Sequence, residues 1–177
     1  MTIDIKQVES LPVVLPPSPW KLIGDFAIGG LLAIGYAGQK DYLLIVSSQG
    51  RGLFDGVHGE KLSRNPDTSN NWLDEIKLTA LGIAPIEDEP VHVAGIFGGG
   101  LPLTTHDGWN IETITSPWTQ TNIFLCKPYT SLFQNIENGF KIATNDICEF
   151  RAVGFSETGN SFAVATSCSL MLFSRTI

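Results

Sequence analysis

The amino-acid sequence predicts an all-β domain, built of antiparallel hairpins and containing at most one short helix. Of the 177 residues, 43% are hydrophobic and 16% are charged, which is the balance of an ordered globule rather than of a disordered chain. Eighteen glycines and ten prolines are spread along the chain and indicate frequent turns. Short apolar runs lie between these turns, as expected of hairpins. The length suits a single domain that covers residues 1–177.

An internal repeat gives the clearest pattern of elements. Residues 33–55 (AIGYAGQKDYLLIVSSQGRGLFD) align without a gap with residues 152–174 (AVGFSETGNSFAVATSCSLMLFS), at an offset of 119 residues. A small residue, a glycine, an aromatic residue, an aliphatic run and a final Leu-Phe recur in register. Each copy therefore predicts three short strands joined by two turns. In the second copy, these turns are expected at residues 156–159 and 167–169.

A third copy is expected to start near residue 94, so that the repeats begin near residues 33, 94 and 152. Residues 93–112 (VAGIFGGGLPLTTHDGWNIE) have the same order of residue types. They predict a glycine turn, a short strand in LPLTT, a second turn at His106-Asp107-Gly108 and a further strand.

Other segments complete the expected list of elements. The apolar run at residues 26–38 is shorter than a bilayer requires and is interrupted by glycines, so it predicts a pair of core strands. The one expected helix covers residues 69–82 (SNNWLDEIKLTALG), with Asn70 or Asn71 as its cap and Gly82 at its end. Residues 118–146 are expected to supply further strands around Phe124, Leu125, Phe133 and Ile142.

Three pieces of the sequence carry a resemblance to a known family: residues 155–174 (FSETGNSFAVATSCSLMLFS), 104–111 (TTHDGWNI) and 50–62 (GRGLFDGVHGEKL). Their order of strands and turns resembles the blade of a WD40-like β-propeller, with Phe173 in the place where that family usually has a tryptophan. The resemblance implies a propeller-like stack of antiparallel sheets that presents loops to partners. A closed propeller usually has four to eight blades. A small or incomplete propeller, a pseudo-threefold barrel and an open sandwich therefore all remain open.

Charge and cysteine content narrow the classes of function. The formal net charge is −7 and the 11 Lys and Arg residues are scattered, so nucleic-acid binding is not expected. The first residues include acidic side chains and no apolar leader, so neither secretion nor membrane insertion is expected. The three cysteines, Cys126, Cys148 and Cys168, form no CxxC pair. They are expected to be reduced thiols in a cytoplasmic protein.

No catalytic or cofactor motif is present. The glycines at positions 98–100 are not followed by Gly-Lys-Ser/Thr and lead into LPLTT rather than a helix, so they predict a turn between strands. The sequence has no G-x-S-x-G motif. The histidines, His58, His92 and His106, lack the spacing of metal ligands. We therefore expect no catalytic residues, no metal site and no cofactor.

Four residues are candidates for binding: Arg51, His106, Asp107 and Trp109. Arg51 stands between two glycines, where its guanidinium is expected to be exposed, and His106 precedes Asp107 in the predicted turn. Trp109 follows that turn, and Trp72 and Trp118 also adjoin polar loop residues. Exposed tryptophan and arginine anchor many interfaces. The alternative is that each tryptophan packs inward between sheets.

These observations favour a non-enzymatic, cytoplasmic protein-binding module that presents loops from a rigid scaffold. An inhibitor-like or immunity-like role suits a small acidic protein that masks a basic partner. One alternative is a small-ligand-binding protein or hydrolase that uses His106, Asp107 and Arg51. Another is a β subunit that completes its sheets by oligomerising.

Overall fold

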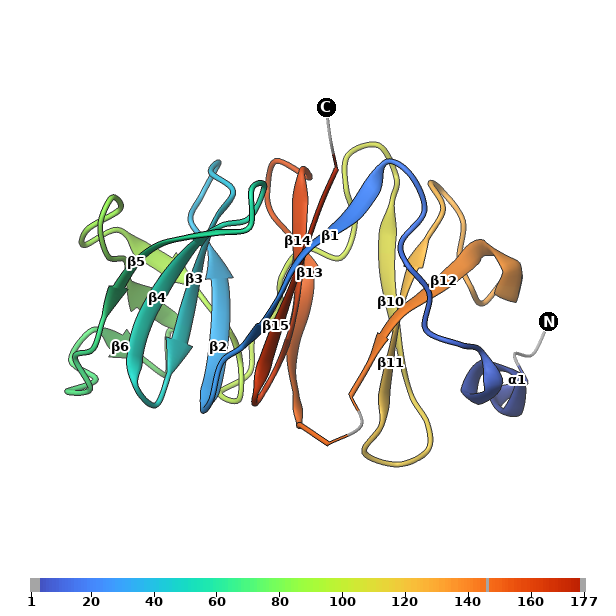
Figure 1. The fold of residues 1–177 in the computed structure, drawn as a ribbon, viewed down its shortest axis with the longest axis horizontal. Coiled ribbons are helices and arrows are strands. Elements are labelled where there is room, and N and C mark those ends of the chain that lie inside the picture. The colour runs from blue at the N-terminus through green and yellow to red at the C-terminus, as the bar shows by residue number, and fades with distance from the viewer. Residues whose placement is uncertain (1–3, 146, 176–177) are drawn as a thin grey trace.

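Antiparallel sheets lie face to face in a row in the computed structural model of this chain, which describes residues 4–145 and 147–175 (Figure 1). Four sheets are present within these residues, and we name them C, B, A and D in their order along the row. The predicted all-β architecture of antiparallel sheets with at most one short helix is confirmed. Sheets C and D lie at opposite ends, so the row stays open in the part of the chain described.

Sheet A contains β1 (Trp20–Ala27), β15 (Ser169–Arg175), β14 (Ser161–Thr166) and β13 (Phe150–Phe155), in this spatial order. Sheet B contains β5 (Glu60–Asn65), β4 (Gly50–Asp55), β3 (Tyr42–Ser47), β2 (Leu31–Tyr36) and β9 (Ala94–Gly95). Sheet C contains β6 (Leu73–Asp74), β7 (Thr79–Leu81) and β8 (Pro90–His92). Sheet D contains β10 (Asn110–Thr115), β11 (Thr121–Cys126) and β12 (Gly139–Thr144).

Sheet A joins the two ends of the chain. Its strands β13, β14 and β15 come from the C-terminal part, and β1 pairs with β15 from Trp20↔Arg175 to Ala27↔Ser169. Strand β1 is therefore the fourth strand of a sheet whose other three strands come from the C-terminal part of the chain. The apolar run at residues 26–38 contains the last two residues of β1 and all of β2, and these strands do not pair with each other, because β1 belongs to sheet A and β2 to sheet B.

The two aligned copies of the repeat have the same layout. Residues 33–55 contain most of β2 and all of β3 and β4, and residues 152–174 contain most of β13 and β15 and all of β14. The shared glycine of each copy lies where another backbone approaches closely. A Cβ atom at Gly35 would lie 2.0 Å from the His92 carbonyl oxygen, and one at Gly154 would lie 2.3 Å from the Leu101 Cβ. The recurring glycine is thus required by packing against these neighbours.

Residues 94–105 follow a different path from the one expected of them, whereas the turn at residues 106–108 forms as expected. β9 pairs with β2, after which the chain passes β13 of sheet A and β10 of sheet D. The Phe155 amide donates to the Pro102 carbonyl oxygen (2.7 Å), and the Ile111 amide donates to the Leu103 carbonyl oxygen (2.8 Å). The expected strand at LPLTT is therefore wrong; proline has no amide proton to contribute to a ladder. The division into three repeats stays a prediction.

The helix expected at residues 69–82 is wrong, because this segment forms β6, a tight turn and β7. The Asp74 carboxylate accepts hydrogen bonds from the amides of Ile76 (3.1 Å) and Lys77 (2.8 Å), and Leu78 has a φ of +55°. This side-chain capping stabilises a turn in place of a helix. The one α-helix described is α1 (Ile5–Ser10), whose N-cap is Asp4; η1 (Ile136–Asn138) is a single 3₁₀ turn.

Each pair of neighbouring layers encloses its own apolar core. Trp20, Trp109 and Phe162 lie between sheets A and D. Separate clusters fill the spaces between sheets B and A and between sheets B and C, and a smaller one lies between sheet D and α1. Within the described residues, neither helix has the length and apolar character needed to cross a bilayer.

A polar contact between two loops fixes sheet B against sheet A. The Asp41 carboxylate accepts hydrogen bonds from the hydroxyls of Ser156 (2.6 Å), Thr158 (2.8 Å) and Ser161 (2.7 Å). Asp41 precedes β3, and the three hydroxyls surround the β13–β14 turn, which was expected at residues 156–159 and is confirmed. Charge-assisted hydrogen bonds are stronger than neutral ones, so this contact fixes the relative position of the two sheets.

Candidate binding surface

Arg51 is buried between sheets B and C, so the exposed position expected for it is wrong. Its side chain lies on the face of β4 that packs on sheet C; the residue is 7% exposed, and its guanidinium carbon lies 4.5 Å from the centre of the Trp72 ring. Nη1 donates to the carbonyl oxygen of Leu81, whereas Nε has no hydrogen-bond partner among the described residues. Burial lowers the pKa of Arg51. A role of Arg51 in binding stays a prediction.

The turn predicted at residues 106–108 is confirmed, and it is held by its own backbone. The Gly108 amide donates to the Thr105 carbonyl oxygen (3.0 Å), and Gly108 has a φ of +89°, which favours glycine. The Trp109 amide donates to the Thr105 hydroxyl (3.0 Å). His106 is exposed at the surface of this turn.

Asp107 and Trp109 attach the turn to sheet A. The Asp107 carboxylate forms an ion pair with Arg175 (2.5 Å), and the Arg175 guanidinium lies 5.2 Å from the centre of the Trp20 ring. The hydrogen bond from Arg175 holds the pKa of Asp107 below its usual value. Trp109 is buried, with its ring centre 6.2 Å from that of Trp20. The turn and Arg51 lie in different interfaces of the row, so the structure does not bring them together.

The most exposed aromatic side chain lies elsewhere, at one end of sheet D. Trp118 is 89% exposed in the β10–β11 turn, and Ile147 is 97% exposed between β12 and β13. These two side chains form what we call the apolar tip. Of the tryptophans, Trp20, Trp72 and Trp109 pack inward and Trp118 does not. The sequence had placed Trp118 beside polar loop residues, but nothing in it distinguished Ile147.

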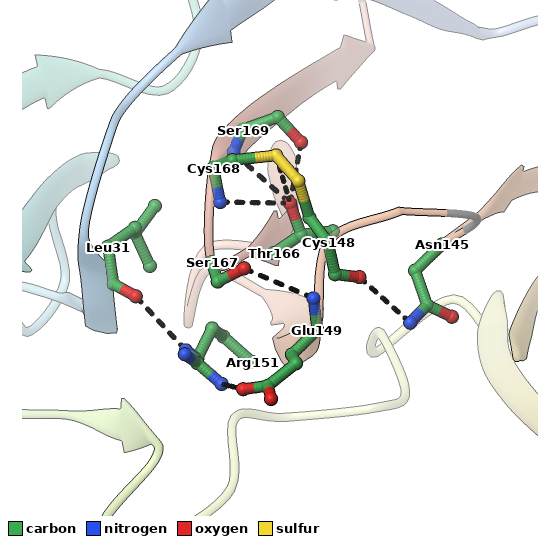
Figure 2. The surroundings of a disulfide bond; sticks show 9 residues. All are labelled: Leu31, Asn145, Cys148, Glu149, Arg151, Thr166, Ser167, Cys168 and Ser169. Carbon is green, nitrogen blue, oxygen red and sulfur yellow. Dashed lines mark hydrogen bonds and ion pairs between the residues drawn. A yellow bond between two sulfur atoms is a disulfide. The ribbon is translucent and has the colours of Figure 1, made fainter. Parts of the chain in front are cut away.

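Asn145 connects the two loops of the apolar tip. It is 7% exposed, and its Oδ1 accepts a hydrogen bond from the Thr121 amide. Its Nδ2 donates to the carbonyl oxygens of Thr119 (3.2 Å) and Cys148 (3.0 Å). The contact with Cys148 is visible in Figure 2. One buried amide group therefore fixes both the Trp118 loop and the segment that follows Ile147.

A disulfide between Cys148 and Cys168 attaches the tip to sheet A, with a Cα–Cα distance of 5.9 Å (Figure 2). The expectation of three reduced thiols is wrong for these two residues. Next to the disulfide, the Glu149 amide donates to the Ser167 hydroxyl (3.1 Å), and the Ser167 amide donates to the Glu149 carbonyl oxygen (2.7 Å). The segment after Ile147 is thus held covalently and by hydrogen bonds.

The remaining cysteine, Cys126, is expected not to react with thiol reagents in the folded protein. It is buried in β11, and burial, with a smaller contribution from Glu112, raises its pKa to about 12. Titration with a chromogenic disulfide should detect no thiol in the native protein and one after unfolding without reductant. It should detect three after reduction and unfolding. A protein that titrates three thiols after unfolding without reductant would contradict the disulfide.

Metal binding finds no support in the side chains present. Among the described residues, no group of three His, Cys, Asp or Glu side chains is arranged to hold a metal ion. His58 Nδ1 lies 2.9 Å from Asp55 Oδ2, and the hydrogen bond that the imidazole donates to this carboxylate raises the pKa of His58. Comparison of the chain with models of protein families and with curated proteins gave no match.

Proposed function

We propose that the protein is a protein-binding module that contacts its partner through the apolar tip, Trp118 and Ile147. The observation that carries this proposal is the exposure of 89% and 97% of these side chains, which adjoin residues held by the Asn145 hydrogen bonds and by the disulfide. A fixed loop loses little conformational entropy on binding, so more of its contact energy contributes to affinity. Tryptophan is also the residue type most enriched among the side chains that dominate binding energy.

The charge of the protein suggests the chemistry of the partner. The net charge of −7 favours association with a protein that carries a basic surface around an apolar pocket. An inhibitor-like or immunity-like role, in which this chain masks such a surface, follows from the same charge balance. The partner's pocket would receive the Trp118 indole.

Two finer interpretations belong with this proposal. The open row of sheets, with β1 completing the sheet of the C-terminal strands, supports the WD40-like interpretation of the sequence. The cytoplasmic location remains a prediction. The Cys148–Cys168 disulfide weighs against it, because disulfides persist mainly in oxidising compartments.

Comparison of matched surface variants tests the proposal. The protein is purified gently from its own cells and examined by native mass spectrometry, and the affinity for any co-purifying polypeptide is then measured. Trp118→Ala is expected to weaken that affinity by about 30-fold or more. Tyr129→Ala is the control, because Tyr129 is an aromatic residue that is 81% exposed outside the tip. Equal affinities for the two variants, or the absence of any partner, would refute the proposal.

The oligomerising subunit remains an alternative that the same spectra decide. β5 forms an edge of sheet B, but it carries the exposed charged residues Glu60, Lys61 and Arg64. Charged side chains on an edge strand oppose pairing with a second copy. A native mass equal to a multiple of the 19.2 kDa chain would favour oligomerisation.

A further inference from the structure

A pocket of about 580 Å³ opens between sheet B and the end of β1. We propose that this pocket binds an amphipathic carboxylate, in which an apolar body carries a single carboxylate group. The pocket is distinct from the apolar tip: none of its lining residues belongs to sheet D. The proposal is therefore independent of the proposed protein-binding function.

The floor of the pocket is apolar. Phe26 of β1 and Phe54 of β4 lie with their ring centres 4.9 Å apart, and Ile28 and Ile45 adjoin them in the same core cluster. Ile45 is 2% exposed and Phe54 5% exposed, so these side chains are already fixed by packing behind the pocket surface. Such a floor suits the apolar body of a ligand.

A glycine leaves part of the space that becomes the pocket. Gly52 lies on the same face of β4 as Phe54, because side chains alternate along a strand. A Cβ atom at Gly52 would meet its nearest neighbour, Phe54 Cε2, at 3.8 Å, which is an ordinary contact. A larger side chain at this position would therefore enter the pocket without disturbing the backbone.

An irregularity in β5 brings two cations to the same side of the sheet. Lys61 pairs with Phe54 and Arg64 pairs with Gly52, with a register shift between them. In a regular strand, residues three positions apart would point to opposite faces. The bulge at Leu62 places Lys61 and Arg64 on the face of Phe54 and Gly52, so both side chains line the pocket.

The charges in the pocket select an anion. Among the described residues, neither Lys61 nor Arg64 forms a side-chain hydrogen bond or an ion pair. No Asp or Glu lines the pocket, although the chain as a whole has a net charge of −7. The Arg51 side chain lies on the other face of β4, against Trp72, so its guanidinium does not compete with Lys61 and Arg64 for the anion. An arginine beside a lysine recognises a carboxylate by charge-assisted hydrogen bonds.

The size of the pocket limits the ligand to a small molecule. Ligand pockets of about 300 to 1,000 Å³ accept molecules of drug size. Decanoate is a suitable probe, because it combines a flexible apolar chain with one carboxylate. Decan-1-ol has the same chain without the charge, so it separates the contribution of the cations from that of the floor.

Calorimetric titration of the full-length protein with decanoate and decan-1-ol, below the concentration at which decanoate aggregates, tests the proposal. Decanoate is expected to bind at one site, at least tenfold more tightly than decan-1-ol. The double variant Lys61→Gln/Arg64→Gln should lose this tenfold preference and keep the weak binding of the alcohol. Decanoate that binds no better than the alcohol, or does not bind, would overturn the proposal.

A second pair of variants locates the site. Gly52→Leu should abolish binding of both probes, because the new side chain fills the pocket. Gly100→Leu is the matched control, since a Cβ at Gly100 meets nothing within 4 Å and Gly100 does not line the pocket. Circular dichroism checks that both variants are folded. Decanoate binding that survives in a folded Gly52→Leu protein would place the ligand elsewhere and refute the assignment.

Discussion

Replacement of Trp20 with alanine is expected to lower the free energy of unfolding by about 4 kcal/mol. Trp20 is 2% exposed, and its ring lies between sheets A and D. The ring centre lies 5.5 Å from that of Phe155 and 5.0 Å from that of Phe162. Removal of the indole leaves a cavity that these fixed aromatic rings cannot fill.

The position of Trp20 at the start of β1 increases the expected effect. β1 is an edge strand of sheet A and is attached through β15 alone within that sheet. The Trp20 ring also lies beneath the Arg175 guanidinium, which forms the ion pair with Asp107. Loss of the ring therefore weakens the attachment of β1 to sheet A and the attachment of the Asp107 turn to β15.

Urea unfolding followed by circular dichroism measures this effect, and the chain supplies its own control. Trp118→Ala removes the same side chain from a position that is 89% exposed, and surface changes of this kind usually alter stability by less than about 0.5 kcal/mol. Similar destabilisation by the two variants would show that Trp20 is not part of a packed core in solution.

The strands that the sequence predicted best are those whose partners are local. Residues 33–55 and 152–174 alternate between turns and apolar runs, and each run pairs with the next one along the chain. Residues 94–105 could not be predicted in the same way. Their hydrogen bonds go to β2, β13 and β10, which lie in three different sheets. The path of such a segment depends on how the sheets are placed, which local patterns do not contain.

The helix expected at residues 69–82 failed for a different reason. Its cap residues and its terminal glycine suit a helix, but Trp72, which precedes β6, and Ala80 of β7 are buried against sheet B. Asp74, which follows the expected cap, accepts hydrogen bonds from the turn between β6 and β7 and so stabilises that turn. A carboxylate near a strand end and one near a helix start look alike in a sequence.

The disulfide follows from the register of a predicted hairpin, whereas the apolar tip does not. The β13–β14 hairpin pairs Phe150 with Thr166, so Cys148 and Cys168 each lie two residues beyond that pair. The expected turn at residues 156–159 implied approximately this register, and hence that the two cysteines face each other. The exposure of Trp118 and Ile147 had no comparable signal, because it depends on where sheet D ends.

Removal of the disulfide is expected to lower the free energy of unfolding by about 3 kcal/mol, on the basis of the loop that it closes. Cys148 and Cys168 are separated by 20 residues. A cross-link across a loop of this length removes conformational entropy mainly from the unfolded chain. The stabilisation should therefore disappear either on reduction or in the double variant Cys148→Ser/Cys168→Ser.

Urea unfolding of four samples isolates this contribution: the wild-type protein and the double variant, each with and without dithiothreitol. Reductant should destabilise the wild-type protein to the level of the double variant and leave the double variant unchanged. The buried Cys126 is the internal control, because it is present in all four samples and forms no disulfide. A wild-type protein whose unfolding does not respond to reductant would contradict the prediction.

The same double variant shows whether the disulfide serves the apolar tip as well as the fold. Asn145 donates to the Cys148 carbonyl oxygen, so the cross-link and the Asn145 contacts restrain the same segment beside Ile147. If the tip binds as a fixed surface, loss of the cross-link adds an entropic cost to binding, and partner affinity should fall even where the variant is fully folded. Unchanged affinity would assign the disulfide to stability alone, with Asn145 and the β10–β11 turn sufficient to position the tip.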